Sequence, residues 1–227
     1  MGAIFKRELK SYFLSPIGYI VTGIFLLCFS IFFTITVFNI GTVDLGVAYW
    51  YTALYGLIII VPLLTMRMFA EERKNGTEQL LLTSPTPISG IVFGKLLASL
   101  VVIGVTLIIS LVYTVIVSFL GTPNYYMILS QIFGFLLISL ATLSFGMFTS
   151  SITENQIISA VITIGFLVTG LFLPDVSNIF SQFTLIDFYT NFVKGILSIE
   201  SIISLILFSG VFISLTLIVM QRRKLVK

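Results

Sequence analysis

Long, uninterrupted apolar runs recur along this chain, and they constrain its fold more than any other feature. A helix needs roughly 17 to 25 apolar residues to cross a hydrocarbon core of about 30 Å. Since 58% of the residues are apolar and only 9% are charged, too little polar surface remains for a water-soluble globule. The sequence therefore predicts an integral membrane protein.

Six of the runs are long enough to cross the membrane. They far exceed the strands of a membrane barrel, and a backbone in lipid must satisfy its hydrogen bonds internally, so each run is expected to be a helix. The fold class is therefore all-α, with a single transmembrane domain over residues 1–227. The first run is too long for the core of a signal peptide, and no typical cleavage site follows it. The predicted spans cover residues 17–38, 50–69, 96–120, 126–148, 157–173 and 202–220.

Basic residues indicate the orientation of these spans. Eleven of the twelve Lys and Arg residues fall before the first span, between the second and third, or after the sixth, and only Lys194 falls on the other side. The positive-inside rule then places both termini in the cytoplasm. The net charge of +3 reports this topology, so no nucleic-acid partner is predicted.

Several chemistries lack the residues they need. The chain has no histidine and one cysteine, Cys28, which argues against most metal sites, Ser-His or Cys-His catalysis and histidine proton relays. Gly90–Lys95 resembles a phosphate-binding loop, but it is one spacer short and Leu96 replaces the Ser or Thr that holds magnesium. We therefore expect no metal, cofactor or catalytic residue in this chain.

The N-terminal 15 residues form an amphipathic pattern. A helix over residues 4–13 would gather apolar side chains on one face and charged ones on the rest, ahead of a turn at Pro16. This pattern predicts an interfacial helix that either anchors the chain or helps to frame a docking site. The apolar face comprises Ile4, Phe5, Leu9, Tyr12 and Phe13.

A polar segment of about thirty residues separates the second span from the third. Asn75-Gly76 is expected to break the helix that leaves the membrane, and Thr77 can cap a short helix over Glu78–Thr83 that Ser84-Pro85 ends. Leu80, Leu81 and Leu82 make this short helix too apolar to face water. A protein partner is favoured over packing back onto the membrane surface.

A mixed segment precedes the sixth span. Pro174 ends the fifth apolar run, and Asp187, Asn191 and Lys194 then share one helical face. The pattern favours a partly inserted, re-entrant helix pair on the outer side. It could line an exit path or act as a lid without touching a substrate.

These features together resemble the permease subunit of a type-2 ABC transporter. The matching stretches are the N-terminal helix, the run Glu71–Glu78 followed by Leu80, Leu81 and Pro85, Gly94-Lys95 at the start of the third span, and the basic tail. Within that family the chain is most similar to the small gliding-motility and copper-enzyme-maturation permeases. Asp187–Ser198, which contains Phe192, Lys194 and Gly195, carries part of that similarity.

The resemblance implies an ATP-driven exporter in the inner (plasma) membrane of a prokaryote. Glu78–Thr83 would be a coupling helix, within a coupling loop over residues 70–95, seated in a cleft of a separate ATPase subunit. Two ATPases, holding ATP and Mg, would act with two permeases, either identical or related. The residues implied to contact the ATPase are Glu71, Glu72, Arg73, Gly76, Thr77, Glu78, Leu80, Leu81, Leu82 and Pro85.

Three other classes of function are alternatives to an ATP-driven exporter. A secondary carrier or channel predicts a charge in the core of a span or an internal repeat, and the sequence contains neither. A non-transporting assembly or force-transmitting subunit could use the same loop. A membrane enzyme fits least, because Glu154 and its neighbours offer no nucleophile-base pair.

The sequence does not single out one substrate. The Ser, Thr, Phe and Ile residues of the spans suit lipids, apolar peptides and drugs equally well.

Overall fold

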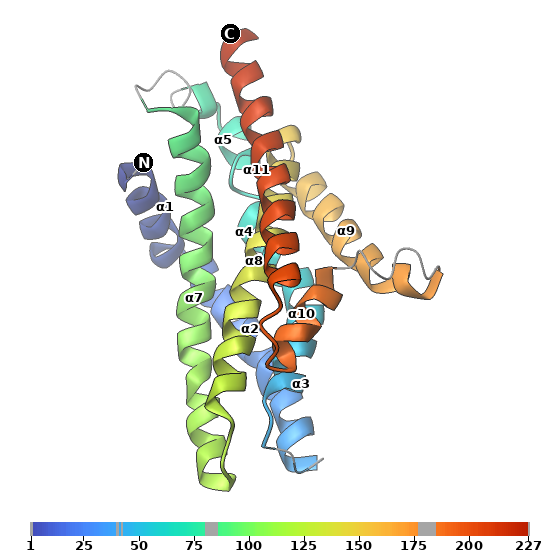
Figure 1. The fold of residues 1–227 in the computed structure, drawn as a ribbon. Coiled ribbons are helices and arrows are strands. Elements are labelled where there is room, and N and C mark those ends of the chain that lie inside the picture. Colours follow the sequence, from blue (N-terminus) through green and yellow to red (C-terminus); the bar gives the residue numbers. More distant parts are fainter. Residues whose placement is uncertain (1, 40, 42, 80–85, 177–184, 227) are drawn as a thin grey trace.

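The computed structural model describes residues 2–39, 41, 43–79, 86–176 and 185–226. Over these ranges the chain forms helices and no strand, which confirms the all-α prediction. The helices pack into an elongated bundle (Figure 1). They are α1 (Gly2–Leu14), α2 (Pro16–Phe33), the π-helical η1 (Thr34–Asn39), α3 (Gly46–Tyr51), the π-helical η2 (Thr52–Gly56), α4 (Leu57–Thr65), α5 (Ala70–Lys74), α7 (Ile88–Leu120), α8 (Tyr125–Ile152), α9 (Gln156–Val176), α10 (Leu185–Val193) and α11 (Ile199–Val226).

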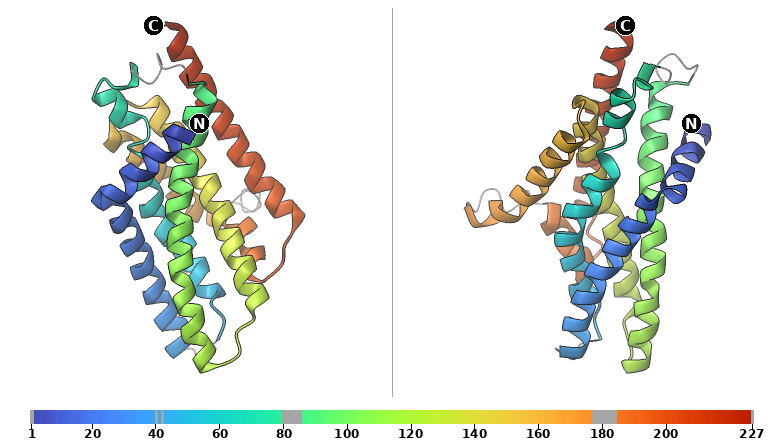
Figure 2. Two further views of the ribbon diagram at one scale, coloured as in Figure 1. Left: turned by 90° about the vertical axis from the view of Figure 1, so that its left-hand side faces the viewer. Right: turned by 180° about the vertical axis from the view of Figure 1, so that it is seen from behind.

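Five helical stretches in the described ranges are long and apolar enough to cross a membrane. The fifth predicted span falls on α9, whose described apolar stretch, Gln156–Gly170, is shorter than the others. Figure 2 shows α9 leaning away from the bundle. A sixth crossing over residues 157–173 therefore stays a prediction. The five stretches are Pro16–Phe38, Gly46–Lys74, Ile88–Leu120, Tyr125–Ile152 and Ile199–Lys224.

Helix α8 is the central element of the bundle. It packs against α4, α7, α9, α10 and α11, and 67% of its most apolar stretch is buried, compared with 17% for α11. Small residues allow these close contacts, as is usual between membrane helices. A Cβ on Gly146 would lie 2.4 Å from Oγ1 of Thr65, so α4 can approach α8 this closely only at a glycine.

The N-terminal helix confirms the predicted amphipathic pattern. Ile4 and Tyr12 are buried, and the Tyr12 hydroxyl donates a hydrogen bond of 3.1 Å to the carbonyl oxygen of Leu64 in α4. At Gly94 of α7, an added Cβ would lie 3.3 Å from the backbone nitrogen of Phe5. The apolar face of α1 is thus partly covered by protein, chiefly α7, and an interfacial position for α1 stays a prediction.

Helix α10 lies against α8, α3 and α11, between the two ends of the molecule (Figure 1). Tyr189 and Phe192 are its buried residues, while Asp187 and Lys194 are exposed. Asn191 donates a hydrogen bond of 2.9 Å to Oγ of Ser201 at the start of α11. The structure therefore ties Asn191 to the start of α11. A lid or exit-path role for the three stays a prediction.

Candidate functional site

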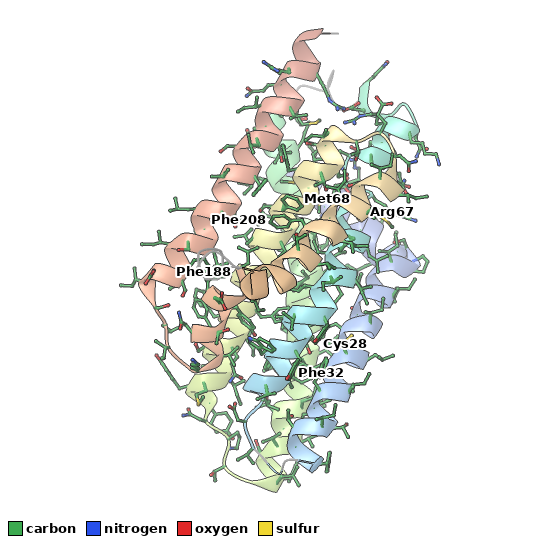
Figure 3. The ribbon with its side chains drawn as sticks, turned by 90° about the vertical axis from the view of Figure 1, so that its right-hand side faces the viewer. Cys28, Phe32, Arg67, Met68, Phe188 and Phe208 are labelled. Carbon is green, nitrogen blue, oxygen red and sulfur yellow. The ribbon has the colours of Figure 1, made fainter. Side chains whose placement is uncertain are left out.

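Charged side chains from several helices meet at one end of the bundle. Both termini and α5 lie toward this end (Figures 1 and 2), and Figure 3 shows Arg67 and Met68 there, far from Cys28 and Phe32. We call it the basic end, and its paired charges form two clusters and one separate pair, Arg67 with Glu71. Its paired side chains are Arg7, Glu8, Arg67, Glu71, Glu72, Arg73, Glu78, Lys95 and Arg223.

The Lys95 cluster (Arg7, Glu8, Glu72 and Lys95) joins α1, α5 and α7. The Lys95 ammonium lies 2.8 Å from Oε1 of Glu72 and 3.2 Å from Oε1 of Glu8, and its side chain is only 2% exposed. Arg7 completes the cluster, at 2.6 Å from Glu8 and 3.0 Å from Glu72. The ammonium also lies 5.4 Å from the ring centroid of Phe69, a cation–π distance.

Charge balance explains how these groups tolerate burial. A buried ion is costly unless it is paired and hydrogen-bonded, and here two cations face two carboxylates. Burial tends to raise the pKa of the Glu8 carboxyl, but Lys95 and Arg7 outweigh it and hold that pKa below its ordinary value. Glu8 is therefore an ionised carboxylate at neutral pH.

The Arg73 cluster (Arg73, Glu78 and Arg223) joins α5, α8 and α11. Nε of Arg73 lies 3.3 Å from Oε2 of Glu78, and NH1 of Arg223 lies 3.3 Å from the other carboxylate oxygen. The Arg73 guanidinium also donates hydrogen bonds to the carbonyl oxygens of Thr153, at 2.6 Å, and Ser151, at 2.8 Å. The side chains of Arg73 and Glu78 are only 9% and 6% exposed.

These contacts make Arg73 the cap of the central helix. The last carbonyls of a helix have no partner within it, and they carry the negative end of the helix dipole. A guanidinium supplies several donors in a fixed plane, so Arg73 can bind these carbonyls and the Glu78 carboxylate at once. The helix leaving the second span is thereby fixed to the end of α8.

The break between α4 and α5 has its own cap. Oγ of Ser150 in α8 accepts hydrogen bonds from the backbone N–H groups of Phe69, at 3.1 Å, and Ala70, at 3.2 Å. These N–H groups begin α5 and lack partners in α4. A buried serine of α8 thus satisfies them, so α5 is held to α8 at both of its ends.

Directly after α5 the chain turns at Asn75-Gly76, where the sequence predicts a helix break. Gly76 has a φ of +70°, a left-handed conformation that favours glycine, and its N–H donates to the carbonyl oxygen of Arg73. The predicted break at Asn75-Gly76 is confirmed. The Thr77 hydroxyl donates to the carbonyl oxygen of Glu72, at 3.2 Å, so it points back to α5.

The predicted contact residues divide into three groups. Gly76 and Thr77 are exposed, and the Glu71 side chain is 38% exposed beside Arg67. Glu72, Arg73 and Glu78 were expected on a docking surface, but they turn into the bundle because each pairs with charges from distant helices. The remaining four lie outside the described residues: Leu80, Leu81, Leu82 and Pro85.

Four residues of the two clusters, Arg7, Glu8, Lys95 and Arg223, were not predicted as site residues, and neither was Ser150. Lys95 is a single charge in otherwise apolar surroundings, which was a usable signal, whereas Glu8 lies among Lys6, Arg7 and Lys10. Arg223 belongs to a run of basic residues near the end of the sequence, and Ser150 is one of many hydroxyl residues in α8, so neither stands out in the sequence. Nothing in the sequence indicates that Ser150 caps a helix some 80 positions earlier.

One comparison with known proteins identifies the family. Residues 43–218, well over half of the chain, match the model of the ABC-2 family transporter protein. No curated protein matches the sequence significantly. The matched range contains Glu72, Arg73, Glu78 and Lys95 but leaves out Arg7, Glu8, Arg223 and all of α1 and α2. A closer kinship with gliding-motility or copper-enzyme-maturation permeases stays a prediction. The chain belongs to the ABC-2 family of transporter proteins, as a multi-pass permease.

Proposed function

We propose that this chain is the transmembrane permease subunit of an ATP-driven exporter and that a separate ATPase grips its coupling loop. One observation carries the proposal: buried ion clusters anchor both ends of residues 70–95. The Arg73 cluster holds the start of the loop to α8 and α11, and the Lys95 cluster holds its end to α1. A displacement of the loop is thereby passed to all three helices.

The proposed mechanism follows from these connections. ATP-driven closure of the ATPases would move the coupling helix, and the buried Arg73–Glu78 pair would carry that motion to α8. Since α8 contacts most other helices of the bundle, its displacement tilts them together. This tilt changes the access of the substrate to a path between the two permease subunits.

The partners follow from the same proposal. Two ATPase subunits hold ATP and Mg, and this chain holds neither. A second permease, identical or related, covers part of the apolar surface, and bilayer lipids cover the rest. Exposed apolar residues on α2, α7 and α11, such as Leu27, Ile108 and Leu207, fit both roles. The basic end, and with it both termini, faces the cytoplasm of a prokaryotic cell.

Leu81→Asp should lower ATP hydrolysis by the complex to the rate of the isolated ATPase and abolish transport. A charge on the apolar face of the coupling helix cannot be buried in the partner's cleft without a large cost. The measurement is ATPase activity of the cognate ATPase co-reconstituted with each permease variant. Gly76→Pro should act in the same direction, because proline cannot adopt the φ of +70° found there.

Asn75→Asp is the matched control, since it adds the same charge to the same loop at an exposed position. It should retain most of the stimulation, and all three variants should insert into membranes normally. Full ATPase activity and co-purification in Leu81→Asp would contradict the proposed coupling role. Stimulated hydrolysis without movement of any cargo in reconstituted vesicles would instead favour a force-transmitting subunit.

A further inference from the structure

A cleft of about 620 Å³ opens at the basic end, between α1 and the break that separates α4 from α5. This volume is within the range of small-molecule binding sites. Part of its wall is apolar, formed by Ile4, Tyr12, Ile17 and Met68. The rest carries hydroxyl groups and charges, so the cleft is amphipathic.

The charges at the cleft differ in how firmly they are held. Lys95 is almost fully enclosed by its two carboxylates. Arg67 and Glu71 are 42% and 38% exposed, and Nε of Arg67 lies 3.8 Å from Oε2 of Glu71, near the limit for an ion pair. This loose pair can turn toward a ligand without disturbing a buried contact, so it offers one cation and one anion.

The surroundings of the cleft suit a lipid. Arg67 is the first charged residue after the apolar α4, and Ile17 stands at the start of the membrane-length α2. The cleft thus lies where an apolar span meets its charged end. Beside it, Leu14, Tyr19 and Ile20 expose apolar side chains, with Leu14 75% exposed. A ligand with a charged group in the cleft could lay acyl chains along this surface.

We propose that the cleft binds the headgroup of a zwitterionic aminophospholipid. The phosphate is recognised by the guanidinium of Arg67 and the ammonium by the carboxylate of Glu71. Purely basic pockets of membrane proteins select anionic lipids, but this lining is electrically balanced. It carries three basic and three acidic side chains: Arg7, Arg67, Lys95, Glu8, Glu71 and Glu72.

The test is native mass spectrometry of the purified full-length chain with added dioleoyl phosphatidylethanolamine or dioleoyl phosphatidylglycerol. The native chain should retain more of the ethanolamine lipid, by about two- to fivefold, the range for a partly exposed ion pair. Arg67→Gln should reduce retention of both lipids, because both carry the phosphate. Glu71→Gln should remove only the preference for the ethanolamine lipid.

Lys74→Gln and Glu154→Gln are the controls, since both replace exposed charges that do not line the cleft. Neither should change the retention or the preference. Equal retention of the two lipids by the native chain would overturn the proposal, as would a loss in the controls equal to that in Arg67→Gln. The proposal requires only that the basic end lies at the membrane surface, so it can fail or hold independently of the coupling role.

Discussion

Arg73→Gln is expected to destabilise the folded chain by about 3–5 kcal/mol, the usual cost of removing one partner from a buried ion pair. Glutamine cannot supply the charge that balances Glu78, and it has too few donors for the carbonyl oxygens of Ser151 and Thr153. Arg223 pairs with Glu78 from the more exposed side and offsets only part of the loss. Unfolding in mixed detergent micelles of increasing SDS content measures the difference.

Lys74→Gln is again the matched control, because Lys74 is the adjacent basic residue and is exposed. It should unfold like the native chain. Arg73→Lys keeps the charge but not the planar arrangement of donors, so it should recover only part of the stability. A native-like unfolding curve for Arg73→Gln would show that Arg73 does not hold α5 to α8.

Lys95→Met should release α1 from the bundle and cost about 3 kcal/mol or more, for the same physical reason. Methionine fills a similar volume, but it leaves the carboxylates of Glu8 and Glu72 close together with only Arg7 between them. Limited proteolysis of the purified chain, followed at sites within residues 2–14, reports the release of α1. Double replacement, Lys95→Met with Glu72→Gln, should restore part of the protection because it removes the surplus negative charge and leaves Glu8 paired with Arg7.

The Lys95→Met defect should also depend on pH. In the native chain the pKa of Glu8 lies below its unfolded value, so its contribution to stability is present at neutral pH and is lost only as pH falls through that lowered pKa. Lys95 is the largest of the effects that lower this pKa, so without it the pKa of Glu8 should rise and the ionised carboxylate should stabilise the fold less. The deficit should therefore be larger at pH 8 than at pH 5. A deficit that does not change with pH, with α1 still protected, would rule out an electrostatic role for Lys95.

The sequence predicts the membrane helices well, because hydropathy over twenty residues averages over local detail. It also predicts the break at Asn75-Gly76, since the chemistry of that turn is local. The weak point is α9, whose described apolar stretch is too short to establish a crossing. Length and composition alone could not determine how far this helix leans from the bundle.

Side-chain burial at the basic end could not be predicted in the same way. Arg73 and Glu78 are in a charged run, which normally faces water, yet both are buried. Their burial depends on the end of α8 and on Arg223, which lie about 80 and 150 positions further along the chain. A single sequence contains no signal of that proximity. The docking role of this loop stays a prediction, but three of the residues assigned to it, Glu72, Arg73 and Glu78, have an internal structural role.

The most direct test of the central claim is to place a photo-crosslinker in the coupling loop. Cys28 is the only cysteine, so Cys28→Ser followed by Leu81→Cys gives a single attachment site for benzophenone maleimide. If the ATPase grips this loop, illumination of inside-out vesicles that contain the cognate ATPase should join the two proteins. The same cysteine in intact cells should not react with an impermeant maleimide. Labelling from outside intact cells, or no ATPase adduct, would contradict this claim.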